Sequence, residues 1–264
     1  MWEREVFDML AFQRHNQIQN LLEQNGAVTI AGLMETFGIS METARRDLAA
    51  MEKAGLLARV HGGALPLSTA RFYRPLKERM QDQLSQKQAI ARAAVEYVRE
   101  GDFIFVSAGS TALAFAKELR KHIRKLTVVT YSLDVFESLH DLPEYTVLLT
   151  GGKYYEKERA FKGPAAAAFL SGVYVQKAFL FPSALSLEAG ITCRTKELVS
   201  RLTPMIHRCD QVFVLADSSK FQKNVFYQVT PLRQDFIIIT DKGLPEELQK
   251  RYADNHLHVI YADE

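Results

Sequence analysis

The chain has 264 residues, of which 47% are hydrophobic and 24% are charged, and its formal net charge is +2. This length allows one large domain or a small domain joined to a medium one. The composition is ordinary for a soluble globular protein and contains no low-complexity tract. A net charge this close to zero excludes a uniformly basic coat for nucleic acid.

The sequence disfavours metal sites, other cofactors, membrane-spanning segments and a signal peptide. Cys193 and Cys209 have no partner at metal-site spacing, which indicates a reducing compartment with buried or idle thiols. The seven histidines show no ligand spacing, so we expect no metal and no other cofactor. No apolar run is long enough to span a bilayer, and the first ten residues are too acidic for a signal peptide. We therefore expect a cytoplasmic protein without membrane contact.

Positive charge is concentrated in one part of the chain. Residues 1–39 carry a net charge of −3, from Arg4 and Arg14 against Glu3, Glu5, Asp8, Glu23 and Glu35. Residues 40–79 carry +4, from Arg45, Arg46, Lys53, Arg59, Arg71, Arg74, Lys77 and Arg79 against Glu42, Asp47, Glu52 and Glu78. Phosphate contacts supply most non-specific affinity for DNA, so a DNA-facing surface needs such a local excess. A solvated surface can carry the same imbalance.

The first elements in chain order predict a winged helix-turn-helix over residues 1–65. Apolar spacing indicates a helix over 12–24, a short strand near 28–30 and a second helix over 31–37. Gly38 permits a tight turn, Ser40 suits the N-cap of a third helix, and Gly55 stops that helix. Residues 56–65 then read as a hairpin around Gly62-Gly63.

The third helix has the pattern of a DNA-reading helix. Ala44, Leu48 and Met51 share one apolar stripe, and charged residues point the opposite way. Arginine suits this position because its planar fork pairs with guanine edges or phosphate. The alternative is a three-helix packing module with a solvated Arg45-Arg46 pair. The expected DNA-binding residues are Ser40, Glu42, Thr43, Arg45, Arg46, Lys53, Arg59 and His61.

Residues 66–84 break the periodicity and read as a linker, after which Ser85 is expected to cap a helix to about Arg99. Strands are predicted at 103–106, 126–130, 146–150, 178–181, 211–216, 235–240 and 257–261. Helices are predicted at 112–121, 133–140, 164–171, 195–207 and 245–252. This alternation predicts an α/β domain over 85–264 with a mostly parallel sheet covered on both faces.

Ligands of such sheets bind at the carboxyl ends of the strands, where this sequence places glycine, hydroxyl, lysine and aspartate residues. A glycine turn before a helix, as at 107–111, can cradle an anion. The set suits a phosphorylated polyol, although ordinary loop chemistry or an Asp217–Lys220 ion pair would look the same. The candidate effector-binding residues are Ser107, Gly109, Ser110, Thr111, Tyr131, Ser132, Gly151, Gly152, Lys153, Glu197, Asp217 and Lys220.

The chain resembles the DeoR family of bacterial transcription regulators over essentially its whole length. The resemblance rests on Arg14, Gly26, Phe37-Gly38-Ile39-Ser40, Thr43, Arg45-Arg46-Asp47-Leu48, Gly55-Leu56-Leu57, Arg59, His61-Gly62-Gly63-Ala64 and the ADSSKF motif at 216–221. It implies a sensor domain similar in fold to ribose-5-phosphate isomerase, with phosphate at the Gly109-Ser110-Thr111 loop. Ala44, Ser107 and Ala184 depart from the family pattern, and Ser107 replaces a carboxylate that would accept from a sugar hydroxyl.

The expected function is a non-enzymatic regulator, more specifically a repressor of a carbohydrate-metabolism operon. Its expected partners are operator DNA, a phosphorylated sugar and a second copy or more of itself, as a homodimer or homotetramer. One alternative is a sugar-phosphate isomerase-like enzyme, although the loop 182–186 offers no carboxylate as a base. Another alternative is a regulator whose second domain only oligomerises.

Overall fold

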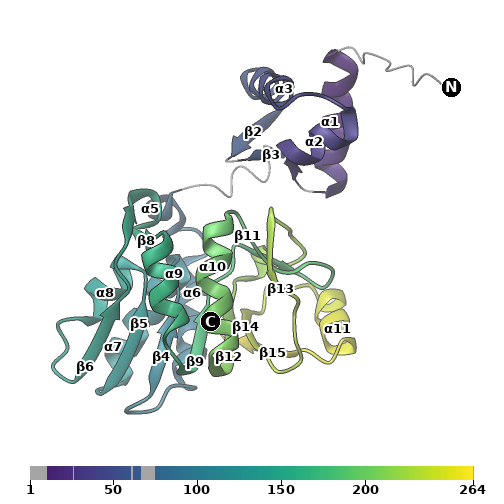
Figure 1. Cartoon of the computed structure of the whole chain (residues 1–264). Coiled ribbons are helices and arrows are strands. Elements are labelled where there is room, and N and C mark those ends of the chain that lie inside the picture. The colour runs from purple at the N-terminus through teal and green to yellow at the C-terminus, as the bar shows by residue number, and fades with distance from the viewer. Residues whose placement is uncertain (1–10, 26, 61, 67–74, 264) are drawn as a thin grey trace. The chain divides into compact units, whose positions relative to one another are not determined.

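The computed structural model describes residues 11–25, 27–60, 62–66 and 75–263, and it forms two compact units that meet in the chain between residues 74 and 75 (Figure 1). The second unit begins within the stretch expected as a linker, because the short helix α5 (Leu76–Arg79) belongs to it. Each unit has its own hydrophobic core.

The first unit is the predicted winged helix-turn-helix. It contains α1 (Ala11–Asn25), β1 (Val28–Thr29), α2 (Ile30–Phe37), α3 (Met41–Lys53), β2 (Leu57–Val60) and β3 (Gly63–Pro66). The three strands form an antiparallel sheet in the order β1-β3-β2. Gly38 ends α2 in the left-handed conformation with φ of 63°. The Ser40 side chain accepts from the Thr43 amide at 3.2 Å, which caps α3 as predicted.

A buried ion pair joins α1 to α3 beside the apolar core of this unit. Arg14 donates to the Asp47 carboxylate at 2.8 and 3.1 Å, and His15 lies 3.3 Å from the same carboxylate. Burial alone would raise the pKa of Asp47, but its bonds to Arg14 and His15 lower it overall. Because folding lowers this pKa, the resulting stability is present above the unfolded pKa and is lost as pH falls through the folded value.

The second unit is built on a seven-stranded sheet in the order β15-β14-β12-β9-β4-β5-β6, and every pairing within it is parallel. The strands are β4 (Phe103–Val106), β5 (Leu126–Thr130), β6 (Tyr145–Leu149), β9 (Val175–Leu180), β12 (Cys209–Leu215), β14 (Ile237–Asp241) and β15 (His258–Ala262). All seven predicted strands are therefore confirmed, with ends shifted by up to three residues.

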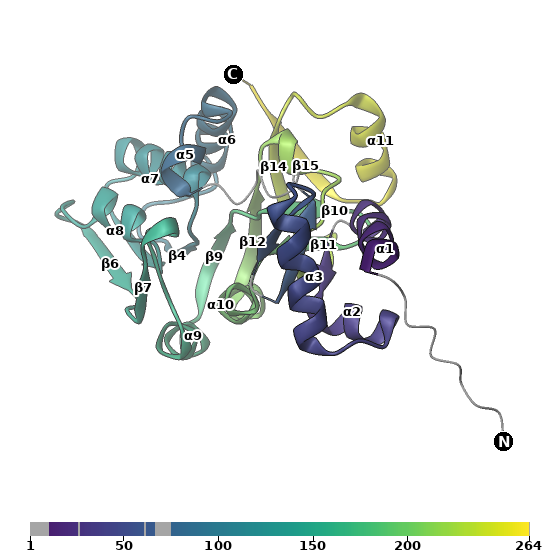
Figure 2. The same cartoon turned by 90° about the horizontal axis from the view of Figure 1, so that it is seen from above.

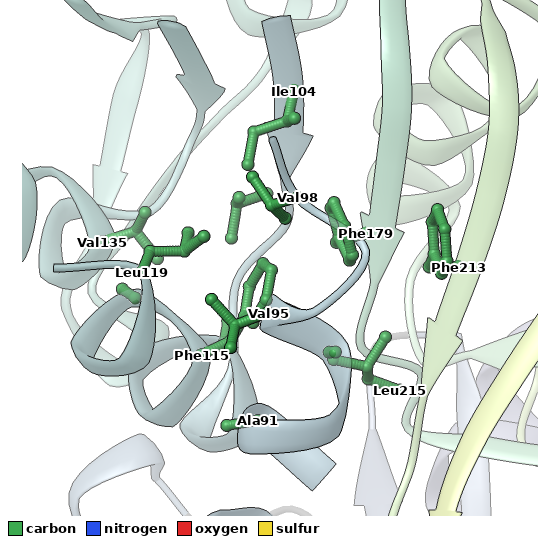
Figure 3. Close-up of a cluster of buried hydrophobic side chains, with 14 of the residues drawn as sticks. Ala91, Val95, Val98, Ile104, Phe115, Leu119, Val135, Phe179, Phe213 and Leu215 are labelled. Carbon is green, nitrogen blue, oxygen red and sulfur yellow. The ribbon is translucent and has the colours of Figure 1, made fainter. Parts of the chain in front are cut away.

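Helices cover both faces of this sheet, as Figure 2 shows. One face carries α6 (Leu84–Val95), α7 (Ser110–His122) and α8 (Leu133–Leu139); the other carries α9 (Pro164–Ser171) and α10 (Lys196–His207), with α11 (Glu246–Asp254) beside β15. Alternate residues of the strands other than β6 enter the two cores, whereas the edge strand β6 contributes Tyr145 and Val147 to the first core only. Figure 3 shows the first core, where Phe179 stacks on Phe213 and packs against Phe115 at ring distances of 4.7 and 4.5 Å.

The sequence did not predict three smaller features. The hairpin β7 (Lys153–Tyr155) and β8 (Ala160–Lys162) follows β6, and a small antiparallel sheet joins β10 (Ala184–Ser186), β11 (Gly190–Cys193) and β13 (Tyr227–Thr230). The 3-10 turn η3 (Ser218–Lys220) follows β12.

One cap was predicted wrongly. Helix α6 begins at Leu84, with Gln83 as its N-cap at φ of 50°, and the Ser85 hydroxyl bonds to Gln86 instead. Ser85 lies inside the helix, so its side chain cannot occupy the capping position.

The two cysteines are separate free thiols, and burial raises the pKa of each to about 11. Among the helices of the described residues, none combines the length and the apolarity needed to cross a bilayer.

The buried ion pair gives a first test. Arg14→Ala leaves the Asp47 charge buried without its main partner, so we expect the winged-helix unit to lose about 3 kcal/mol of stability. Hydrogen exchange of the α1 and α3 amides in the full chain measures this loss. Glu52→Ala, which breaks the half-exposed Glu52–Arg59 pair, is the matched control and should cost under about 1 kcal/mol. Equal losses in both variants would contradict the assignment.

Candidate nucleic-acid interface and ligand site

The outer face of α3 presents the predicted charged residues to solvent. Glu42, Arg45, Arg46 and Lys53 are exposed, while Ala44, Leu48 and Met51 are buried on the opposite side. Within the described part of the chain, no carboxylate forms an ion pair with Arg45 or Arg46. Both guanidinium groups are therefore available to an external anion.

The remaining predicted DNA-binding residues have varied surroundings. The Ser40 and Thr43 hydroxyls bond to each other at 2.9 Å, so both contribute to the cap of α3. Arg59, on β2, lies 3.5 Å from Glu52, and its amide donates to the same carboxylate. His61 lies outside the described residues.

The order of the large sheet reverses beside β4. From β4 the chain proceeds to β5 and β6 on one side, and it then returns to place β9 on the other side of β4. Ligands of such sheets usually bind at the carboxyl ends of the strands that flank the reversal, which are β4 and β9 here. The Ser107 hydroxyl accepts from the Phe181 amide at 3.2 Å, so it ties the two strand ends together there.

The N-terminus of α7 begins directly at this point. Gly109 is its N-cap at φ of 146°, and no side chain caps the helix. Ser110 and Thr111 form the first turn, whose backbone amides are the usual donors to a bound phosphate. Gly109, Ser110 and Thr111 are therefore placed next to Ser107, as expected.

Asp217 and Lys220 follow β12, with Asp217 as the N-cap of the turn η3 and Lys220 as its last residue. Asp217 is buried and accepts from the Ser219 amide at 3.1 Å, which holds its carboxylate in place. Burial lowers the pKa of the Lys220 ammonium, and the nearby Asp217 carboxylate opposes that shift. The Asp217 carboxylate is thus within electrostatic reach of the Lys220 ammonium, and a ligand contact from either side chain stays a prediction.

Further cations surround this pair and were not among the predicted site residues. The positive charges of Arg79, Arg194 and Lys223 lower the pKa of Lys220. The charge of Lys220 in turn lowers the pKa of Lys87, and the charge of Asp217 raises it. Burial lowers the pKa of Lys87 to about 8. A signal for Lys87 was present in the sequence, because it shares the helical stripe of Ile90 and Ala94, where a lysine is unusual.

Tyr131 and Ser132 mainly hold the scaffold together. The Tyr131 ring lies in the core under the guanidinium of Arg201 at 4.3 Å, and its hydroxyl reaches Ser107. Burial raises the pKa of this hydroxyl. The Ser132 hydroxyl accepts from the Val135 amide at 3.3 Å and caps α8. A ligand contact from either side chain stays a prediction.

Gly151 and Gly152 shape the turn after β6, both with positive φ. A Cβ at Gly152 would lie 2.7 Å from the Lys162 carbonyl oxygen, so the β7–β8 hairpin requires glycine there. Lys153 and Glu197 are exposed. Among the described residues, no hydrogen bond or ion pair joins either side chain to Asp217. In the described ranges no group of His, Cys, Asp or Glu is placed to hold a metal ion.

Two family models match the chain: the DeoR-like helix-turn-helix domain over residues 14–70, and the DeoR C terminal sensor domain over residues 82–242. The chain belongs to the DeoR family. The family resemblance seen in the sequence is thereby confirmed, as is its class, a DNA-binding transcription regulator.

Two relatives that this DeoR-family chain matches over most of their length are repressors by name. It is 34% identical to the transcriptional repressor AccR of Agrobacterium fabrum, over 91% of this chain and 96% of the relative. It is 35% identical to the lactose phosphotransferase system repressor of Lactococcus lactis subsp. lactis, over 90% and 94%.

A more distant similarity is to a solved enzyme. Ribose 5 phosphate isomerase A of Neisseria gonorrhoeae matches with a TM-score of 0.38 and 19% identity, over 51% of this chain and 52% of the enzyme. The chain thus spans about half the length of that enzyme. A similarity this weak carries no argument about activity.

The two glycines after β6 form a matched pair for mutation. Gly152→Ala forces the hairpin away from the Lys162 carbonyl and strains a φ of 108°, so we expect a loss of roughly 1–3 kcal/mol. Gly151→Ala has open space around its Cβ and should cost only about 1 kcal/mol for its positive φ. Hydrogen exchange of residues 153–162 measures both. A larger effect at Gly151 would contradict the model of the turn.

Proposed function

We propose that this DeoR-family protein is a sequence-specific repressor of a carbohydrate-metabolism operon and that a phosphorylated sugar controls its binding to DNA. The observation that carries the proposal is that β4, β9 and β12 are neighbours in one parallel sheet, with β4 leading into the uncapped N-terminus of α7 and β12 leading into Asp217 and the half-buried Lys220. A phosphorylated ligand supplies the anion that both features favour. The lactose phosphotransferase system repressor named above supports a link to sugar metabolism.

In this proposal α3 enters the major groove. Arg45 and Arg46 contact base edges or phosphate, and Ser40, Glu42, Thr43, Lys53, Arg59 and His61 line the same interface. A homodimer or homotetramer presents two such helices to two half-sites one helical turn apart.

The sugar phosphate binds with its phosphate at Gly109, Ser110 and Thr111 and near Lys220. Asp217 accepts from sugar hydroxyls, and Ser107, Tyr131, Ser132, Gly151, Gly152, Lys153 and Glu197 complete the site. Ser107 is a weaker acceptor than a carboxylate, so it influences which sugar is preferred. The ligand shifts the equilibrium between DNA-binding states through its different affinity for each of them.

Fluorescence anisotropy on DNA from upstream of the protein's own gene tests the whole proposal. We expect tight, salt-sensitive binding that one member of a panel of phosphorylated sugars relieves or enhances. Binding that ignores every compound would instead favour a second domain that only oligomerises. An absence of DNA binding would contradict the proposal and call for an assay of sugar-phosphate isomerisation.

The DNA-reading role of α3 has its own test. Arg46→Ala should weaken specific binding by about 1–3 kcal/mol and relax the base preference at one operator position. Lys53→Ala removes a charge from the same helix and, as a phosphate contact, should weaken binding to all sequences about equally. Anisotropy with matched and mismatched operators separates these outcomes. Undiminished specific binding by Arg46→Ala would rule out the proposed orientation of α3.

The ligand site can be tested without disturbing DNA binding. Lys220→Ala removes a half-buried cation, so we expect ligand affinity to fall by roughly 1.5–3 kcal/mol while DNA binding without ligand is unchanged. Titration calorimetry with the active sugar phosphate measures this loss. Lys242→Ala, at an exposed lysine paired with Asp263, is the control and should bind normally. A normal response from Lys220→Ala would place the ligand elsewhere.

A further inference from the structure

Lys87 is a buried lysine whose charged end bonds to backbone rather than to a side chain. Its ammonium donates to the Arg79 carbonyl oxygen at 2.7 Å and also to the carbonyl oxygen of Asp82. The residue is only 3% exposed. Lysine is almost never this buried unless its ammonium has partners, and here the two carbonyl oxygens are those partners. These two bonds fasten the helix α6 to the segment that precedes it.

That segment, residues 75–83, is the first part of the sensor unit after the chain leaves the DNA-binding unit. It contains α5, and its Arg79 side chain also pairs with Glu158 in the turn between β7 and β8. Its last residue, Gln83, has a φ of 50°, a conformation that costs free energy for any residue other than glycine. The bonds from Lys87 therefore join two points of this segment, Arg79 and Asp82, to α6.

The same ammonium lies within electrostatic reach of the proposed ligand site. The Asp217 carboxylate attracts its charge, and Lys220 and Arg79 repel it. An anion bound beside Lys220 would add attraction at this position. It would thereby stabilise the buried ammonium in the position from which it donates to the two carbonyl oxygens.

We propose that Lys87 is the positioning residue that transmits ligand binding at Asp217 and Lys220 to residues 75–83, through its hydrogen bonds to the Arg79 and Asp82 carbonyls. This inference rests on the proposed ligand site. A bound anion strengthens the two bonds and fixes the segment, and an empty site leaves the segment free to open. The change then begins at the residues that continue directly into the DNA-binding unit.

Hydrogen exchange of residues 75–86 in the full-length protein tests this, with inorganic phosphate as the probe that all phosphorylated sugars share. In the wild type we expect phosphate to slow exchange of this segment roughly tenfold, within the usual range of coupling between sites. Lys87→Met keeps most of the apolar stem and removes the donors, so the segment should no longer respond. Phosphate binding itself, followed by the phosphorus NMR signal, should persist in this variant.

Lys87→Arg, which retains donors and charge, should restore part of the response, and the exposed Lys242→Met should behave as the wild type does. A wild type that binds phosphate without any change in residues 75–86 overturns the inference and leaves the proposed function intact, and this result needs no variant. A Lys87→Met protein that still responds overturns it too. Loss of phosphate binding in Lys87→Met would make Lys87 a ligand contact instead. A wild type that binds no phosphate overturns both proposals.

Discussion

The sensor unit depends on the burial of β4 beside β9 in the centre of a parallel sheet. Ile104, Phe105 and Val106 of β4 are fully buried, as are Ala178, Phe179 and Leu180 of β9. Each large side chain contributes about 1.5–3 kcal/mol by leaving water, so neither strand can shift without exposing both cores. The carboxyl ends of the two strands are consequently held at fixed positions.

This constraint allows polar and charged groups to gather where they would otherwise be costly. Buried charges destabilise a fold unless they are paired. Several cations lie near the strand ends, and the Asp217 carboxylate is the opposite charge that acts on Lys87 and Lys220. The lowered pKa values of Lys87, Lys220 and Lys223 have the same origin, because burial disfavours their charged forms. An anionic ligand would offset the free-energy cost of burying these positive charges, so its binding would be favoured.

The two units use charge in different ways. In the winged-helix unit the buried Arg14–Asp47 pair is internal, whereas Arg45 and Arg46 on the opposite face of α3 are solvated and available to DNA. In the sensor unit Lys87 is buried, and Lys220 and Lys223 are half-buried and interact with the same Asp217 charge. Solvated cations suit rapid, salt-dependent contact with phosphate backbones, and buried cations suit selection of a small ligand.

The sequence by itself determined the main elements, because their signals are local. Short apolar runs marked all seven strands of the sheet, and the stripe of Ala44, Leu48 and Met51 oriented α3 correctly. The strand-end motifs also predicted that Ser107, Gly109 and Asp217 follow strands of one parallel sheet, and the structure has them after β4 and β12, which are separated by β9. The tertiary structure alone decided the small sheet of β10, β11 and β13, because β11 and β13 pair across more than thirty residues of chain. It also decided that Ser132 caps a helix and that Lys87 is buried within electrostatic reach of Asp217. These outcomes depend on which distant backbone groups approach each other, and no local periodicity encodes that approach.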